Sequence, residues 1–167
     1  MMYKSVYLSP LGELFLVSDG NNLTGLYTKN QKYLDMTIFD TMVLNNDLEI
    51  FKNTKIWLDK YFHKKNPAIS DLKIAPEGSE FRKEIWSLLC KIPYGQTVTY
   101  DDLAKEIAVI RNIKKMSPQA VGGAVGHNPI SIIIPCHRVI GKNGSLTGYA
   151  GGLEMKKRLL EMENYIN

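Results

Sequence analysis

The chain has 167 residues, of which 44% are hydrophobic and 23% charged, a composition typical of a globular protein with one sizeable core or two small ones. No apolar run approaches the roughly 20 residues of a membrane-spanning helix, and the first residues lead into an alternating segment, so we expect a cytoplasmic protein. The net charge of +4 favours a polyanionic partner only weakly, and two cysteines are too few for a disulfide framework.

The first 62 residues predict a small α/β unit. Residues 3–8 and 13–18 alternate apolar and polar side chains around Pro10-Leu11-Gly12, which predicts a β-hairpin. Residues 23–27 offer a third strand. A helix is expected from Asp47 onward, where apolar residues recur at helical spacing: Leu48, Phe51, Leu58 and Phe62.

A boundary between two domains is expected near residues 66–78. Pro67, Pro76 and Gly78 interrupt both the strand and the helix periodicities in this segment. We therefore divide the chain into an N-terminal α/β domain, residues 1–75, and a C-terminal domain, residues 76–167.

The C-terminal domain should begin with an amphipathic helix. Apolar residues recur from Phe81 to Ile92, Ser79 can cap the start, and Pro93 must end the helix. Cys90 lies within it, where a small apolar thiol is more often a core residue than a reactive one.

Two short helices with clear start signals follow and resemble a helix-turn-helix. Thr99 and Asp102 form a capping box that opens a helix over residues 100–108, and Ser117-Pro118 opens a second through about Val125. The second helix contains Gly122-Gly123, which costs stability unless another group comes very close, either DNA or a neighbouring helix. Both explanations remain open.

The segment between these helices is basic. Arg111, Lys114 and Lys115 lie in residues 109–116, which contain no acid. A solvated loop or a phosphate-binding loop would both explain this composition.

The chemical site is expected at Cys136. A β-branched run, residues 130–134, predicts a strand that leads into Pro135-Cys136-His137-Arg138. An unperturbed cysteine is only a few per cent thiolate at neutral pH, so a nucleophile needs a nearby cation or donor, such as His137 or Arg138.

A buried cysteine at the end of a core strand is the alternative. The surrounding pattern favours the nucleophile, because the motif is followed by a glycine-rich loop, residues 141–152, that could wrap a planar ligand. A final helix is expected from Leu153 to about Asn164.

These motifs resemble the O6-alkylguanine-DNA alkyltransferase family. The resemblance rests on Pro135-Cys136-His137-Arg138-Val139-Ile140, on Ala120-Val121-Gly122-Gly123-Ala124 and on His127-Asn128-Pro129. It is strong from about Phe81 to Glu163 and weaker over the first 75 residues. It implies an α+β fold: a small N-terminal ribonuclease H-like α/β domain with a short antiparallel sheet, then a mainly helical domain with a winged helix-turn-helix.

The resemblance also implies a reaction. Cys136 would accept the alkyl group of O6-alkylguanine in double-stranded DNA once and irreversibly, and O4-alkylthymine would be a second candidate substrate. His137 would act through a water as its base, and Glu163 would orient His137. Tyr149 would donate a hydrogen bond toward the guanine, and Asn128 would join the second helix to the active-site turn.

Further positions are assigned to the DNA and the flipped base. Tyr100 would press on the phosphate at the lesion, and backbone groups of Cys136, Val139 and Ala150 would read the guanine edge. Arg138 is included in this set. Gln119 stands where the family often has an arginine that fills the gap left by the base.

Some expectations are negative. His63 is the only histidine or cysteine before Cys90, so the zinc site of some relatives is not expected, nor is a cofactor or membrane partner. We expect a monomer. A lesion-binding protein without repair activity and a Cys-His hydrolase are the rival functions, and neither accounts for both Cys136 and the helix pair.

Overall fold

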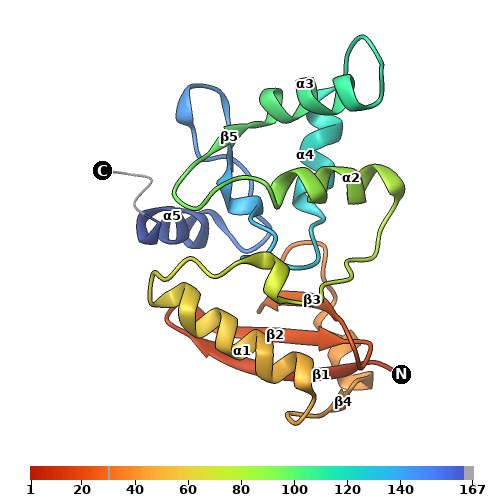
Figure 1. The fold of residues 1–167 in the computed structure, drawn as a ribbon, viewed down its shortest axis with the longest axis vertical. Helices are drawn as coiled ribbons and strands as arrows, with labels where there is room; N and C mark the ends of the chain where they lie inside the picture. The colour runs from red at the N-terminus through yellow and green to blue at the C-terminus, as the bar shows by residue number, and fades with distance from the viewer. Residues whose placement is uncertain (30, 164–167) are drawn as a thin grey trace. The chain divides into compact units, whose positions relative to one another are not determined.

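The structure is a computed structural model that describes residues 1–29 and 31–163, and it divides into two compact units (Figure 1). The first unit contains residues 1–77 together with Pro129–Ser131. The second contains Gly78–Asn128 and continues from Ile132. None of the described helices is long and apolar enough to span a membrane.

The first unit is built on a four-stranded sheet with the order β3-β2-β1-β4. β1 (Tyr3–Ser9) and β2 (Gly12–Ser18) form the predicted antiparallel hairpin, and β3 (Leu23–Thr28) pairs antiparallel with β2. Gly12 has a φ of 111°, which explains the glycine at the hairpin turn. A short β4 (Val43–Leu44) adds a parallel edge strand beside β1, which the sequence did not predict.

Helix α1 (Glu49–Phe62) follows the sheet, close to where the apolar spacing predicts it. Its buried face includes Phe51, Trp57, Leu58 and Tyr61. A 3-10 turn η1 (Met36–Thr41) precedes it, and η2 (Ile69–Asp71) lies in the segment expected as a linker. That segment is more ordered than expected, because Leu23 and Ile74 form a parallel bridge.

Three helices of the second unit begin at the predicted caps. α2 (Glu80–Leu89) starts after Ser79, whose hydroxyl accepts from the amide of Arg82. α3 (Tyr100–Ile110) has the complete capping box of Thr99 and Asp102, and α4 (Pro118–Gly126) starts after Ser117. The Trp86 indole donates to the carbonyl of Ala124 at 2.8 Å, which ties α2 to α4.

The rest of the second unit consists of short elements and one helix. β5 (Val98–Thr99) pairs in parallel with β6 (Val139–Ile140) and accompanies the α3–α4 pair in a winged helix-turn-helix. The 3-10 turns η3 (Cys136–Arg138) and η4 (Lys142–Gly144) flank β6. α5 (Leu153–Met162) ends the described chain, and the predicted end at Asn164 lies outside the described residues.

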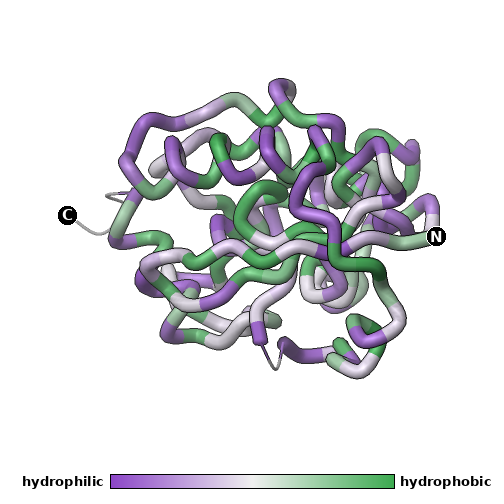
Figure 2. The backbone as a smooth tube through the Cα atoms, turned by 90° about the horizontal axis from the view of Figure 1, so that it is seen from below, coloured by the Kyte–Doolittle hydropathy of each residue, from purple (hydrophilic) through white to green (hydrophobic). Residues whose placement is uncertain are grey.

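The helices are amphipathic, and the tube in Figure 2 changes between hydrophilic and hydrophobic every few residues along them. The buried apolar side chains of the second unit come from α2, α3, α4 and α5 and include Ile85, Leu103, Val121 and Leu159. The fold is therefore α+β, with a sheet-based first unit and a mainly helical second unit.

The strand predicted over residues 130–134 is wrong. Only Ile130 makes a β-bridge, to Leu26, and the chain then turns, with Ile132 at a φ of 72°. The isoleucines of the run are buried, so its apolar, β-branched composition reflects burial in a turn. Pro129 and Pro135 bracket the run and supply no amide hydrogens for a ladder.

Candidate active site

Cys136 begins a 3-10 turn directly after the buried turn of residues 130–134. Its side chain is only 5% exposed, and its amide donates to the carbonyl of Ile134 at 2.8 Å. The side-chain amide of Asn128 donates to the same carbonyl at 2.8 Å. Asn128 follows α4 by two residues, so it links the end of that helix to the turn that carries the thiol.

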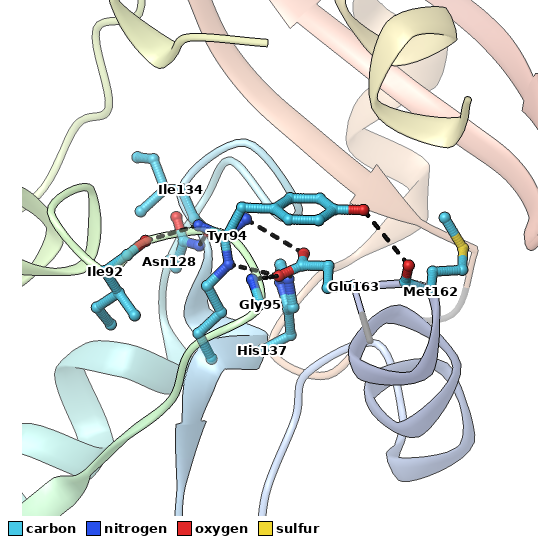
Figure 3. A network of polar contacts seen from close by, with 9 residues as sticks. Ile92, Tyr94, Gly95, Asn128, Ile134, His137, Met162 and Glu163 are labelled. Carbon is cyan, nitrogen blue, oxygen red and sulfur yellow. Dashed lines mark hydrogen bonds and ion pairs between the residues drawn. The ribbon is translucent and has the colours of Figure 1, made fainter. Parts of the chain in front are cut away.

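The carboxylate of Glu163 is the centre of a buried network (Figure 3). The Nε2 atom of His137 lies 2.6 Å from Oε2, and Nε of Arg138 donates to Oε1 at 2.8 Å. The amide of Gly95 also donates to Oε1, at 3.1 Å. Arg138 donates as well to the carbonyl of Ile92 at 2.7 Å. Residues from three segments of the second unit therefore meet at this carboxylate: the turn η3, the stretch after α2 and the end of α5.

This network sets the charge states of its members. Burial acts to raise the pKa of Glu163, but the hydrogen bonds and charges of His137 and Arg138 outweigh it and hold that pKa far below the usual range. Burial lowers the pKa of His137, although Glu163 opposes this effect. An ionised Glu163 beside a neutral imidazole requires the proton on Nε2.

The other ring nitrogen of His137 is consequently the proton acceptor. Nδ1 is buried and has no hydrogen-bond partner within the part of the chain that the structure describes. A buried acceptor held in a fixed tautomer is suited to general-base chemistry.

The thiol of Cys136 differs from the sequence-based expectation of a lowered pKa. Burial raises the pKa of Cys136 and is the dominant effect, while hydrogen bonds from Asn128 and Tyr149 and the charge of Lys156 oppose it. Arg138 is directed to Glu163 and Ile92 instead of the thiol. The resting state is therefore the protonated thiol, surrounded by groups that stabilise a thiolate once one forms.

Lys156 is a site residue that the sequence analysis missed. It lies on α5, its side chain is fully buried, and its ammonium group donates to the carbonyls of Val139, Thr147 and Gly148 at 2.5, 3.0 and 3.1 Å. Burial lowers the pKa of Lys156 to about 8, with Cys136 acting in the opposite direction. A lysine in an amphipathic helix is ordinarily read as exposed, so the sequence offers no signal for this role.

Tyr149 belongs to the glycine-rich loop and acts to lower the pKa of Cys136. Gly151 leaves room for its ring, because a Cβ there would lie 2.8 Å from the Tyr149 ring. Ala150 is half-buried in the turn before α5. The carbonyl of Val139 already accepts from Lys156 and keeps one lone pair for another donor.

Two of the predicted DNA-contacting residues, Gln119 and Tyr100, lie in the first turns of α4 and α3. Gln119 is exposed in the first turn of α4, and the hydroxyl of Tyr100 donates to the carbonyl of Thr147 at 3.1 Å. A Cβ on Gly123 would meet no atom of residues 1–29 or 31–163 within 4 Å, and one on Gly122 would lie 3.8 Å from the Tyr100 ring. Internal packing does not require either glycine, which favours the close approach of an external partner.

Arg138 is placed differently from its assignment to the DNA-contacting set. Its side chain is 8% exposed and is held by Glu163 and the carbonyl of Ile92, so its geometry favours orienting Glu163.

The three basic residues of the segment between α3 and α4 differ from one another in their ion pairing. Arg111 pairs with Glu84 on α2, whereas no ion pair of Lys114 or Lys115 is present among residues 1–29 and 31–163.

Across the described ranges, no cluster of three or more His, Cys, Asp or Glu residues could hold a metal ion. The candidate site therefore consists of a buried thiol, its hydrogen-bond donors, and a neutral histidine fixed by an ionised carboxylate. Such a set can move one proton and carry out one nucleophilic displacement.

Two family models match the chain and together cover almost all of it. The model described as 6-O-methylguanine DNA methyltransferase, DNA binding domain, matches residues 80–165. The model described as 6-O-methylguanine DNA methyltransferase, ribonuclease-like domain, matches residues 2–76.

Individual relatives match over nearly their whole length. A methylated-DNA--protein-cysteine methyltransferase of Methanosarcina acetivorans is 42% identical over 163 residues, which cover 97% of this chain and 98% of the relative. The Haemophilus influenzae protein of that name is 40% identical over 162 residues, 97% of this chain and 86% of its own.

Solved structures from Mycobacterium tuberculosis have the same fold. Its O6-methylguanine methyltransferase is 36% identical, with a TM-score of 0.84 over 98% of this chain and 93% of that chain. The structure described as OGT in complex with DNA is 35% identical, with a TM-score of 0.83 over 96% of this chain and 92% of that chain.

Proposed function

The chain belongs to the 6-O-methylguanine DNA methyltransferase family, and on this premise we propose that it repairs DNA by transferring the alkyl group of O6-alkylguanine to Cys136. The observation that carries the proposal is the buried thiol of Cys136, whose pKa Asn128 and Tyr149 act to lower and which directly precedes the His137 of the His137–Glu163 pair in the chain. A structural cysteine has no need of this arrangement.

The reaction is an in-line displacement at the alkyl carbon. The thiol proton passes to Nδ1 of His137, directly or through a water, as the sulfur attacks. A C–S bond forms, the bond between that carbon and O6 of guanine breaks, and the guanine leaves with its bonding electron pair. A hydrogen bond from Tyr149 to the departing base would disperse that charge.

The product explains why each chain would act once. A thioether at Cys136 offers no good leaving group, so the alkyl group stays on the sulfur and the thiol is not regenerated. The protein is therefore both the enzyme and the consumed reagent.

Double-stranded DNA is the proposed partner. Because Cys136 is only 5% exposed, the damaged base must leave the stack to reach it. The exposed face of α4, with Gln119 and Gly123, is the proposed contact with the duplex, and Tyr100 is proposed to press on the phosphate at the lesion. Gln119 would fill the gap left by the base without adding a positive charge.

Three finer points belong to the same proposal. One chain suffices for the transfer, since Cys136, His137, Glu163 and Tyr149 all belong to it, so the reacting species is a monomer. The substrate lies inside the cell, which supports a cytoplasmic location. O4-alkylthymine is proposed as a second substrate.

A mass measurement tests the proposal. The protein is incubated with an oligonucleotide duplex containing O6-methylguanine, and we expect a gain of one methyl group on the peptide that contains Cys136. The peptide with Cys90 is the internal control, because burial also raises the pKa of that thiol and it should stay unmodified. An unmodified Cys136, or full repair by a Cys136→Ala variant, would refute the proposal.

A further inference from the structure

A turn between α2 and β5, residues 92–95, contacts both partners of the buried Arg138–Glu163 ion pair (Figure 3). The carbonyl of Ile92 accepts from Nη1 of Arg138 at 2.7 Å. The amide of Gly95 donates to Oε1 of Glu163 at 3.1 Å. Main-chain groups do not titrate, so neither contact depends on a change of protonation in the turn. We call these four residues the 92–95 turn.

The Gly95 amide influences how the two oxygens of Glu163 are used. Oε1 accepts from Gly95 and from Nε of Arg138 at 2.8 Å. Oε2 lies 2.6 Å from Nε2 of His137 and also accepts from Nη2 of Arg138 at 3.2 Å. A carboxylate with donors on both oxygens does not rotate freely, so Oε2 stays directed at the imidazole. Its position keeps the proton of the neutral ring on Nε2 and leaves Nδ1 as the acceptor.

Position 95 has no room for a side chain. Gly95 has a φ of 78° and is the third residue of a β-turn in which the amide of Gln96 donates to the carbonyl of Pro93 at 3.1 Å. This conformation alone would also tolerate asparagine. A Cβ on Gly95, however, would lie 2.9 Å from the backbone oxygen of Glu163, closer than such atoms come in folded proteins. The approach to Glu163 therefore requires glycine for a reason that the turn itself does not supply.

The side chain of Tyr94 contacts the other partner of the ion pair. The guanidinium carbon of Arg138 lies 5.7 Å from the centre of the Tyr94 ring, within the range of a cation–π interaction. The Tyr94 hydroxyl donates to the carbonyl of Met162, the last residue of α5, at 3.4 Å. The side chain thus supports both the arginine and the helix end that precedes Glu163.

We propose that Tyr94 and Gly95 are positioning residues of the alkyl-transfer site. They act through Arg138 and Glu163: by fixing the carboxylate they fix the tautomer of His137 and keep its Nδ1 free to take the thiol proton. The inference rests on the proposed alkyl transfer and deepens it. In the alternative, the 92–95 turn only connects α2 to β5, and its variants would lose stability without any change in the base.

Alanine at position 95 tests the close approach to Glu163. Gly95→Ala adds the Cβ that meets the Glu163 carbonyl, so the carboxylate should move away from His137. Gly12→Ala is the matched control. Gly12 also has a positive φ, of 111°, but a Cβ there would meet no atom of the described residues within 4 Å, so this variant strains the backbone without the contact.

Leucine at position 94 tests the ring without straining the backbone, which keeps the proposal testable if Gly95→Ala does not fold. Tyr94→Leu removes the contact with Arg138, and Tyr94→Phe restores the ring without the hydroxyl. Tyr7→Leu is the matched control, since Tyr7 is also a half-buried tyrosine and its hydroxyl donates to Asp59 at 2.6 Å.

Two measurements separate positioning from stability. Single-turnover transfer from a duplex with O6-methylguanine gives an end point, which counts the competent chains, and a rate constant, which reports their chemistry. Nitrogen NMR of protein with isotopically labelled histidine shows which ring nitrogen of His137 carries the proton, and His137→Gln identifies its signals. The NMR measurement does not require the protein to transfer an alkyl group.

For Gly95→Ala and Tyr94→Leu we expect a rate constant at least about tenfold below that of the wild type, at an unchanged end point. The signals of His137 should change from one form, with the proton on Nε2, to a mixture of both tautomers. Because Glu163 acts to raise the pKa of His137, displacing it should also move the acid limb of the rate profile to lower pH. Tyr94→Phe should recover most of the rate.

The controls Gly12→Ala and Tyr7→Leu should keep the rate constant and the tautomer of the wild type. Variants at Tyr94 and Gly95 that lose only the end point, with the wild-type rate constant and a single tautomer, would overturn the proposal. Equal rate losses in the controls, or a Tyr94→Phe variant as slow as Tyr94→Leu, would also contradict it. A wild type that takes up no alkyl group would refute the proposed function, and the tautomer in the variants would still decide this inference.

Discussion

The thiol of Cys136 combines low reactivity at rest with a prepared environment for its anion. Burial raises the pKa of Cys136, so the group stays protonated and resists the oxidation and side reactions of an exposed thiolate. Asn128 and Tyr149 act to lower the pKa of Cys136 against the effect of burial, so groups that favour the anion lie near the sulfur before it forms. The thiol is therefore selective because a substrate must reach the buried sulfur and because the thiolate forms only during the reaction. A permanently lowered pKa is not needed.

Lys156 offers a test of this balance. In Lys156→Met, three carbonyls lose a charged donor inside the protein, and the free energy of unfolding should fall by about 3 kcal/mol. The loss of the cation should also raise the pKa of Cys136 further and shift the pH profile of alkyl transfer upward. Chemical denaturation and single-turnover kinetics against pH measure the two effects.

The neighbouring Lys157→Met is the control for Lys156→Met. Lys157 is 54% exposed and lies 3.9 Å from Glu161, so its replacement should change neither measurement appreciably. A Lys156→Met variant with an unchanged pH profile would reduce Lys156 to a purely structural role.

At the scale of the element, α4 contains glycine, which lowers the stability of the helix but leaves its exposed face without a bulky side chain at that position. Its buried residues, Val121, Ala124 and Val125, fix the helix on the second unit, while Gln119, Ala120 and Gly123 are exposed. Glycine in a helix interior costs about 1 kcal/mol relative to alanine, and no atom of the described residues lies close enough to require it at position 123. The proposed duplex contact explains the residue.

Gly123→Ala should therefore separate stability from binding. We expect the free energy of unfolding to rise by up to about 1 kcal/mol and the affinity for duplex DNA to fall, because the new methyl group stands on the proposed contact face. Thermal unfolding and a binding titration measure the two quantities. Ser87→Ala, at an exposed position of α2, is the matched control: it should stabilise its helix without weakening DNA binding.

The sequence predicted the turns and the helix starts, which depend on residues close together in the chain. The hairpin around Gly12, the capping box of Thr99 and the cap at Ser117 were confirmed, because turns and caps are set by residues close in the chain. The prediction of a strand over residues 130–134 was wrong, because burial favours isoleucine in a buried turn as much as it does in a strand. Lys156 and the orientation of Arg138 depend on long-range contacts, which no periodicity encodes.

At the scale of the whole molecule, charge is unevenly distributed along the chain. No Asp or Glu occurs between Glu106 and Glu154, a stretch that contains α4, Cys136 and the glycine-rich loop. Positive charge is thus concentrated where the polyanion is proposed to bind. Glu163, which comes after this stretch, is screened from the polyanion by burial and by its pairing with His137 and Arg138.

The Glu163 network should also make folding stability depend on pH. The pKa of Glu163 is held below its usual value near 4.5, and burial lowers that of His137 below 6.5. Between each folded value and the usual one, the unfolded chain binds more protons, so stability falls as the pH falls through both windows. The loss should begin near pH 6.5 and steepen below pH 4.5.

Urea unfolding at successive pH values measures this loss. Glu163→Gln removes the carboxylate, leaves Arg138 buried without its charge partner and should cost about 3–5 kcal/mol at neutral pH. Its stability should then depend less steeply on pH below 4.5 than that of the wild type. Glu161→Gln, at a side chain that is 49% exposed, should follow the wild type. Equal slopes for Glu163→Gln and the wild type would show that other carboxylates govern acid unfolding.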